Sequence, residues 1–235
     1  MNSFDYAIIK FINQFSAKSW AFDKIIGFLA GNNLYKGGVL IALIWWAWFK
    51  REDRHTRNRE HILSTLLSCV VAIFLGKVLA SILPFRLRPI HEASLRFLLP
   101  FDEHTIDLEG WSSFPSDHAA LFFTISVGLL FIAKRVGLFA LFYTILFILF
   151  PRVYLGYHYP SDIIVGAMIG TITALIGNIY FVKNKNIRSI IDWSYAKPHI
   201  FYPLFFLLTY QVVDLFYNLR TTAHGISELI KRIIA

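Results

Sequence analysis

Three short polar segments at the ends of apolar runs each contain residue types that can bind or transfer a phosphoryl group. The segments are Leu83–Pro89, Phe114–His118 and Pro151–Asp162. A guanidinium group binds phosphate oxygens through two parallel hydrogen bonds, and Arg88 and Arg152 supply one such group each. This pattern indicates a site for a phosphate-like anion.

Two of these segments also have the sequence of a helix start. Ser116 follows Pro115 and precedes an apolar run, which is typical of an N-cap residue. Pro160-Ser161-Asp162 repeats the arrangement before the next apolar run. The first backbone N–H groups of a helix have no partner within the helix and point at any bound anion. We therefore expect two helix N-termini at the site.

Two histidines and an aspartate complete the set of reactive groups. A neutral imidazole, such as that of His118 or His158, can attack phosphorus or carry a proton near neutral pH. Asp162 can fix the histidine tautomer that leaves the attacking nitrogen free. Nothing in the three segments resembles a thiolate or carboxylate-rich cage, so the sequence predicts neither a metal nor a cofactor.

The composition indicates that the solvent of this protein is a lipid bilayer. Of the 235 residues, 56% are hydrophobic and only 16% are charged, whereas about a quarter of the residues of a soluble domain are charged. The formal net charge of +8 would suit a nucleic-acid-binding protein. However, the cations lie between apolar runs and form no basic stripe, which favours membrane topology over nucleic acid.

Apolar runs predict an all-α fold, a polytopic bundle of about six transmembrane helices in a single domain spanning residues 1–235. The expected spans are Leu34–Phe49, Ile62–Leu83, Phe114–Ala133, Val136–Phe150, Ile163–Val182 and Ile200–Phe216. Several are shorter than the roughly 20 residues that cross a bilayer, so their ends must extend or dip. Ahead of them, Tyr6–Ala30 mixes apolar and polar residues in the pattern of an amphipathic helix in the membrane interface.

The cations in the connections predict how the bundle is oriented. One side has eleven: Lys50, Arg51, Arg54, Arg57, Arg59, Lys134, Arg135, Lys183, Lys185, Arg188 and Lys197. The other side has four: Arg86, Arg88, Arg96 and Arg152. Cytoplasmic connections carry the excess of lysine and arginine. We therefore expect a multi-pass protein of the cell (inner) membrane, with the three polar segments together on its periplasmic or extracellular face.

In these three segments the chain resembles the type 2 phosphatidic acid phosphatase superfamily. The signatures of that superfamily are Lys-x6-Arg-Pro, Pro-Ser-Gly-His and Ser-Arg-x5-His-x3-Asp. The matching residues here are Arg88-Pro89 for the first, Pro115, Ser116 and His118 for the second, and Arg152, His158 and Asp162 for the third. The resemblance covers a motif-bearing core of about residues 66–182.

Three positions depart from these signatures. Asp117 replaces the usual glycine and adds a carboxylate beside the anion site, and Pro151 replaces the serine before the arginine. Ser81 stands where the lysine of the first signature is expected. Lys77 lies one helical turn earlier on a similar face, and Arg86 is a second candidate for the missing positive charge.

The resemblance implies a two-step displacement without a divalent metal. His158 would attack the terminal phosphorus and form a phosphohistidine, while Asp162 holds its other ring nitrogen. His118 would protonate the leaving lipid oxygen and then activate water. The groups that would hold the phosphate oxygens are Arg88, Arg152, the Ser116 hydroxyl and nearby backbone amides. Lys77, Arg86 and Asp117 are further candidates at this site.

The motif variants are most similar to those of bacterial undecaprenyl pyrophosphate phosphatases. They imply that the chain converts a polyprenyl diphosphate to the monophosphate. Phosphatases of phosphatidylglycerol phosphate, phosphatidic acid or lipid A share the scaffold and remain alternatives, as does a lipid phosphotransferase. A transporter or a vanadium-dependent oxidase is a more distant alternative, because transporter charges usually lie near the midplane and the oxidases are soluble.

Overall fold

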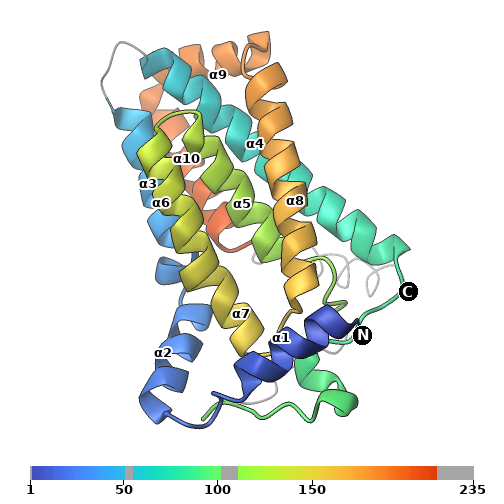
Figure 1. Ribbon diagram of the computed structural model, residues 1–235. Coiled ribbons are helices and arrows are strands. Elements are labelled where there is room, and N and C mark those ends of the chain that lie inside the picture. The colour runs from blue at the N-terminus through green and yellow to red at the C-terminus, as the bar shows by residue number, and fades with distance from the viewer. Residues whose placement is uncertain (1, 51–54, 102–110, 216–235) are drawn as a thin grey trace, which may run out of the picture.

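The structure is a computed structural model that describes residues 2–50, 55–101 and 111–215, and within these ranges every regular element is a helix or helical turn (Figure 1). The elements are α1 Ser3–Asn13, α2 Trp20–Gly31, η1 Leu34–Gly38, α3 Val39–Phe49, α4 His55–Ile82, η2 Pro89–His91, η3 Ala93–Leu95, α5 Asp117–Leu130, α6 Lys134–Tyr143, η4 Thr144–Leu149, α7 Phe150–Tyr154, α8 Pro160–Ile176, η5 Gly177–Phe181, α9 Lys185–Ala196 and α10 Pro198–Val213. The predicted all-α class is confirmed.

Helix α5 lies at the centre of the bundle and is buried along most of its length. Its buried positions are 119–122 and 124–129, and Phe123 between these two runs is half-buried. The buried residues come from all sides of the helix and are almost all apolar. A helix that is apolar on all sides is suited to the interior of a bundle.

Two glycines of α8 set its distance from α5. A β-carbon at Gly166 would lie 2.4 Å from the Ser116 carbonyl oxygen, and one at Gly170 would lie 2.2 Å from the Ala120 carbonyl oxygen. Both distances are far below van der Waals contact, so the two backbones can approach this closely only where α8 has no side chain. This packing brings the N-termini of α5 and α8 together at one end of the bundle (Figure 1).

The described helices provide three to four candidate membrane spans. Thr56–Ile82, Lys134–Tyr154 and Pro160–Phe181 are long and apolar enough to cross a bilayer, with 27, 21 and 22 residues. The pair Trp20–Gly31 and Leu34–Phe49, bent by 67°, passes the same test only when its two parts are taken together. Helices α5 and α10 are apolar but shorter, so the count of six spans stays a prediction. Phe216, the expected end of the last span, and Arg51 and Arg54 of the cation count lie outside the described residues.

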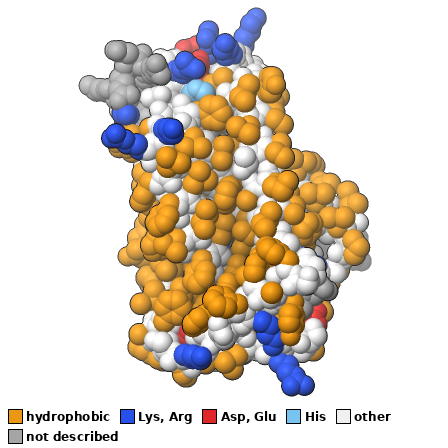
Figure 2. Space-filling model, viewed as in Figure 1, with side chains coloured by type: hydrophobic (Ala, Val, Ile, Leu, Met, Phe, Trp, Pro, Cys, Tyr) orange, Lys and Arg blue, Asp and Glu red, His pale blue; other side chains and the backbone are white. Residues whose placement is uncertain are grey.

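The sides of the bundle are suited to contact with lipid. Large apolar side chains are exposed along the helices, for example Phe74 on α4, Phe142 on α6, Met168 on α8 and Phe206 on α10. Figure 2 shows hydrophobic side chains over the length of the face in view, with lysines and arginines gathered toward its two ends. An apolar surface of this extent is typical of an interaction with a membrane.

The segment Tyr6–Ala30, expected to form one amphipathic helix, is divided into α1 and α2. Ala17 has a φ of 56°, in the left-handed region that a continuous right-handed helix cannot contain. The Ser19 side chain then accepts a hydrogen bond from the backbone N–H of Phe22 at 3.4 Å and caps the start of α2. The location of these two helices in the membrane interface stays a prediction.

The fourth predicted span continues past its expected end at Phe150. The π-helical turn η4 precedes α7, and Pro151 stands in the first turn of α7, where a missing N–H is tolerated. The helix therefore extends to Tyr154, and Arg152 lies on its last turn instead of in a connection. Because Arg152 is part of this helix, its side chain has a fixed direction, toward α5.

Candidate active site

The starts of α5 and α8 are joined to each other by backbone contacts. Ser116 is fully buried, and its Oγ accepts a hydrogen bond from the backbone N–H of Ala119 at 3.4 Å, as expected for an N-cap. The backbone N–H of Ser116 donates to the Asp162 carbonyl oxygen at 3.1 Å. The Asp162 side chain in turn accepts from the backbone N–H of Tyr159 at 2.8 Å. Two helix N-termini therefore lie side by side, and both favour a bound anion.

His158 is buried beside these helix starts, and its proton can be assigned from its partner. Its Nδ1 lies 2.8 Å from the carbonyl oxygen of Ser113 and 3.7 Å from Oδ2 of Asp162. The first distance is that of a hydrogen bond and the second is too long for one. Because a carbonyl oxygen only accepts, Nδ1 carries the proton and Nε2 keeps its lone pair. His158 is therefore in the tautomer that a nucleophile needs.

The partner of His158 differs from the one that the resemblance implies. The Ser113 carbonyl oxygen takes the place expected for Asp162, whose carboxylate lies nearby without a hydrogen bond to the ring. Burial lowers the pKa of His158, and the Asp162 carboxylate opposes this shift. A lowered pKa keeps the imidazole neutral, and thus nucleophilic, at neutral pH.

Two arginines present buried hydrogen-bond donors that have no partner. Arg88 donates from Nη1 to the Tyr157 carbonyl oxygen at 2.7 Å, and Arg152 donates from Nη2 to the Ala30 carbonyl oxygen at 3.1 Å. The Nε atoms of both arginines are buried without a partner. A buried donor left unpaired costs about 1–3 kcal/mol. A phosphate group that accepts from these donors would remove that cost.

His118 lies in the first turn of α5 and contacts Arg152. Its Nε2 is 2.9 Å from Nη2 of Arg152. A guanidinium group cannot accept a hydrogen bond, so Nε2 of His118 accepts and is unprotonated in this arrangement. Before His118 can give a proton to a leaving group, Nη2 of Arg152 must stop donating to Nε2 of His118. A phosphate oxygen is a suitable new acceptor for this donor.

Lys77 forms an ion pair with Asp117, the residue that replaces the glycine of the family signature. Its Nζ lies 2.5 Å from Oδ2 of Asp117 and 4.8 Å from the centre of the Trp111 ring. The side chains of Lys77 and Asp117 are 35% and 22% exposed, so water screens their interaction in part. Lys77 thus reaches the start of α5, where it balances the charge of Asp117 next to His118.

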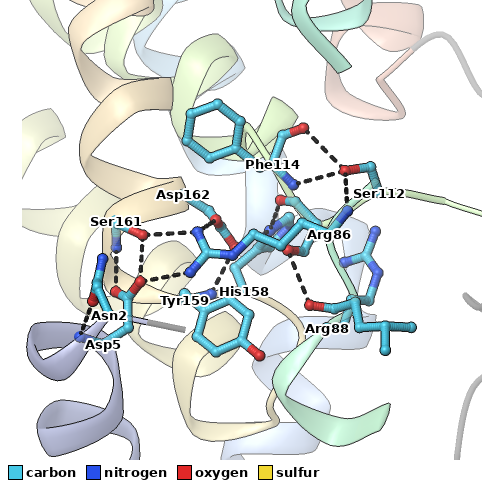
Figure 3. Close-up of polar contacts among 12 residues, drawn as sticks. Asn2, Asp5, Arg86, Arg88, Ser112, Phe114, His158, Tyr159, Ser161 and Asp162 are labelled. Carbon is cyan, nitrogen blue, oxygen red and sulfur yellow. Dashed lines mark hydrogen bonds and ion pairs between the residues drawn. The ribbon is translucent and has the colours of Figure 1, made fainter. Parts of the chain in front are cut away.

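Arg86, the other candidate for the missing positive charge, bridges two fully buried carboxylates (Figure 3). Its Nη1 lies 2.6 Å from Oδ1 of Asp162, and its Nη2 lies 2.6 Å from Oδ2 of Asp5. Nη1 also donates to Oγ of Ser161 at 2.9 Å. The guanidinium group packs over the Tyr159 ring, 4.1 Å from its centre. These contacts direct Arg86 toward carboxylates of the protein.

The structure brings all nine sequence-predicted site residues to one end of the bundle, and it adds three groups that the sequence did not indicate. Two of these are Asp5 and the Ser113 carbonyl oxygen, described above. The third is Lys36 of η1, whose ammonium group interacts electrostatically with Arg152 and His118. No local pattern marks any of them, because each meets the site only through the packing of distant segments.

Among the residues that the structure describes, no group of three or more His, Cys, Asp or Glu side chains is placed to hold a metal ion.

Comparison with known proteins gives a consistent family match. The model of the PAP2 superfamily matches residues 61–186, a range that contains all three polar segments. The "Bacitracin transport permease protein BcrC" of Bacillus licheniformis is 31% identical over 167 residues, which cover 71% of this chain and 75% of the relative. The "Undecaprenyl-diphosphatase BcrC" of Bacillus subtilis is 25% identical over 188 residues, which cover 80% of this chain and 88% of the relative.

A solved structure agrees with these sequence matches. The crystal structure of Aquifex aeolicus LpxE superposes with a TM-score of 0.51 at 28% sequence identity. The superposition covers 74% of this chain and 94% of that chain.

Proposed function

The chain belongs to the PAP2 superfamily, and we propose that it removes the terminal phosphate of a polyprenyl diphosphate and leaves the monophosphate. The family makes the protein a phosphatase, and its relatives support a lipid phosphate as the substrate. The observation that carries the proposal is the pair of arginines with buried, unpaired donors beside two histidines and two helix N-termini. The diphosphate is favoured by the similarity to the Bacillus subtilis undecaprenyl-diphosphatase.

In the first step we assign the attack to His158. Its Nε2 forms a bond to the terminal phosphorus as the bond from phosphorus to the bridging oxygen breaks. The ring then carries a positive charge, which the Ser113 carbonyl oxygen at 2.8 Å and the Asp162 carboxylate at 3.7 Å stabilise. Arg88 and Arg152 hold the oxygens of the transferring group.

The leaving group and the water require a proton carrier, and we assign this role to His118. Once Arg152 donates to a phosphate oxygen, Nε2 of His118 is free to take up a proton from solvent and give it to the departing lipid monophosphate. His118 then takes a proton from water as the water oxygen attacks phosphorus and the bond from phosphorus to Nε2 of His158 breaks. Inorganic phosphate leaves, His158 returns to its neutral form, and the cycle needs no divalent metal.

Phosphate release by the purified protein in detergent tests this proposal. The substrates are undecaprenyl diphosphate, phosphatidic acid, phosphatidylglycerol phosphate and a soluble phosphate ester, each with excess chelator and with His158→Ala as the blank. We expect kcat/KM for undecaprenyl diphosphate to exceed the values for the other substrates by ~10-fold or more, about 1.4 kcal/mol of discrimination.

A higher kcat/KM for another lipid would identify that lipid as the substrate instead. Activity that depends on added Mg²⁺ would contradict the metal-free mechanism, and transfer to a lipid acceptor without phosphate release would identify a phosphotransferase.

We further propose that the site faces the periplasm or the cell exterior in the cell (inner) membrane. Support comes from the cations in the connections between the predicted spans, most of which lie at the opposite end, among them Lys134, Lys183 and Lys185 of the described residues. A variant without Cys69 can carry one reporter thiol at exposed Ala93 or at exposed Asn186. An impermeant reagent should label the thiol at position 93 in outer-membrane-permeabilised cells and leave the one at position 186 unlabelled. The reverse pattern would invert the orientation.

A further inference from the structure

The N-terminal helix α1 contributes a fully buried carboxylate to the edge of the candidate site. Asp5 accepts hydrogen bonds from the Ser161 backbone N–H at 2.9 Å and from the Ser161 hydroxyl at 2.6 Å. Arg86 donates to the same side chain at 2.6 Å. Ser161 lies in the first turn of α8, next to Asp162. Asp5 is therefore hydrogen-bonded to the start of a helix that contributes to the site (Figure 3).

Asp5 determines which donor Arg86 turns toward Asp162. Because Nη2 is bound to Asp5, Arg86 presents Nη1 alone to Oδ1 of Asp162. Oδ2 of Asp162 then stays with the Tyr159 backbone N–H and 3.7 Å from Nδ1 of His158. A guanidinium group without a second carboxylate prefers a bidentate pair. Without Asp5, Arg86 would therefore engage both oxygens of Asp162 and draw Oδ2 away from His158.

We propose that Asp5 is a positioning residue of this enzyme, acting through Arg86 to hold the Asp162 carboxylate beside His158. The inference rests on the proposed function, since it concerns the charge that forms on His158 during transfer. It makes α1 a part of the working site, although Asp5 and Ser161 are 156 positions apart in the chain.

Asp23 on α2 provides a matched control for Asp5. It is also fully buried, and it accepts from the Tyr154 hydroxyl and from the backbone N–H groups of Ala17 at 3.0 Å and Phe101 at 2.9 Å. None of these partners is a residue that we assign to the reaction. Asp23→Asn therefore reports the cost of disturbing a buried carboxylate on an N-terminal helix without disturbing Asp162.

The test is a double-mutant cycle on kcat, measured with the lipid that the wild type hydrolyses. In Asp5→Asn the amide oxygen can still accept from the Ser161 backbone N–H and the amide nitrogen can donate to the Ser161 hydroxyl oxygen, but the charge that holds Nη2 of Arg86 is lost. We expect kcat to fall by ~10-fold with KM within about twofold, while Asp23→Asn keeps kcat within about twofold. The Arg86→Lys background keeps the positive charge but cannot bind Asp5 and Asp162 at once through two donors. In this background Asp5→Asn should lower kcat by less than about twofold.

The outcomes separate this inference from the proposed function. An equal loss of kcat from Asp5→Asn in both backgrounds would show that Asp5 only anchors α1, and an unchanged kcat in the single variant would overturn the inference directly. Each variant is compared at a temperature below its melting transition in detergent, so that unfolding does not enter kcat. Failure of the proposed function appears instead as a wild type that releases no phosphate from any lipid.

Discussion

The two ends of the bundle each contain a buried histidine, but in different surroundings. At the end opposite the site, Nδ1 of His61 on α4 donates to Oδ1 of Asn178 on η5 at 2.9 Å. The Asn178 amide nitrogen donates to the Thr65 hydroxyl at 3.1 Å and to the Ala174 carbonyl oxygen at 2.9 Å. These contacts connect two helices within the bundle, a use of polar side chains that is common in membrane proteins.

At the site end, the histidines lie at helix starts and contact groups that can change partner. His118 accepts from Arg152, and Nε2 of His158 is free of its proton. Burial is common to His61 and His158, so it does not identify the reactive histidine. An unprotonated ring nitrogen and a buried arginine donor without a partner, Nη1 of Arg59, also occur at the opposite end. What distinguishes the site is that its histidines and arginines lie at two adjacent helix N-termini, which favour an anion.

His158→Ala should be the most damaging substitution. Loss of the nucleophile removes the only route by which phosphorus becomes bound to the enzyme in this mechanism, so kcat should fall by at least ~10³-fold. Phosphate release from the folded variant in detergent provides the measurement. Substantial turnover by the variant would remove the nucleophile assignment and with it the distinction between the two ends.

His118→Ala should rank second in its effect on turnover. General acid–base help contributes ~10²-fold or more, so kcat for the lipid substrate should fall by at least that factor. A phosphate ester with a good leaving group needs less protonation and should lose less. An equal loss for both substrates would contradict a role in protonating the leaving oxygen.

Lys77→Met should lower kcat by ~10-fold. The substitution leaves the Asp117 carboxylate without its partner at 2.5 Å, and an unbalanced negative charge beside His118 repels the phosphate. Asp117→Asn added to Lys77→Met should restore part of the lost activity, because it removes that charge. If Lys77→Met retains the wild-type kcat, the lysine has no electrostatic role in the reaction.

His61→Ala, at the opposite end, should change stability and leave activity almost intact. The variant removes the donor at 2.9 Å from Oδ1 of Asn178 and leaves it only the Thr65 hydroxyl at 3.5 Å, which should lower the free energy of unfolding by about 1–3 kcal/mol. The kcat of the folded protein should stay within about twofold of wild type, because His61 contacts no residue assigned to the reaction. Melting in detergent and phosphate release measure the two quantities. A large loss of kcat without a loss of stability would show that the two ends are not separate in function.

The sequence predicts the helix starts at the candidate site better than it predicts the elements around them. Ser116 and Pro160 mark helix starts by local chemistry, so both N-termini could be predicted from a few neighbouring residues, and the PAP2 family is confirmed. The break at Ala17 has a local signal in Ser19, which caps α2, whereas the extension of the fourth span past Pro151 has no clear local signal. The Ser113 carbonyl oxygen is a backbone group, which no residue type identifies.

Phosphorus bound to His158 during turnover is the decisive observation for the mechanism. Undecaprenyl diphosphate labelled in its terminal phosphate is mixed with enzyme in detergent, quenched in alkali, under which phosphohistidine survives, and digested. We predict label on the peptide that contains His158, more of it in His118→Ala because hydrolysis by water is slowed, and none in His158→Ala. Turnover without label on this peptide, in both the wild type and His118→Ala, would contradict the phosphohistidine mechanism.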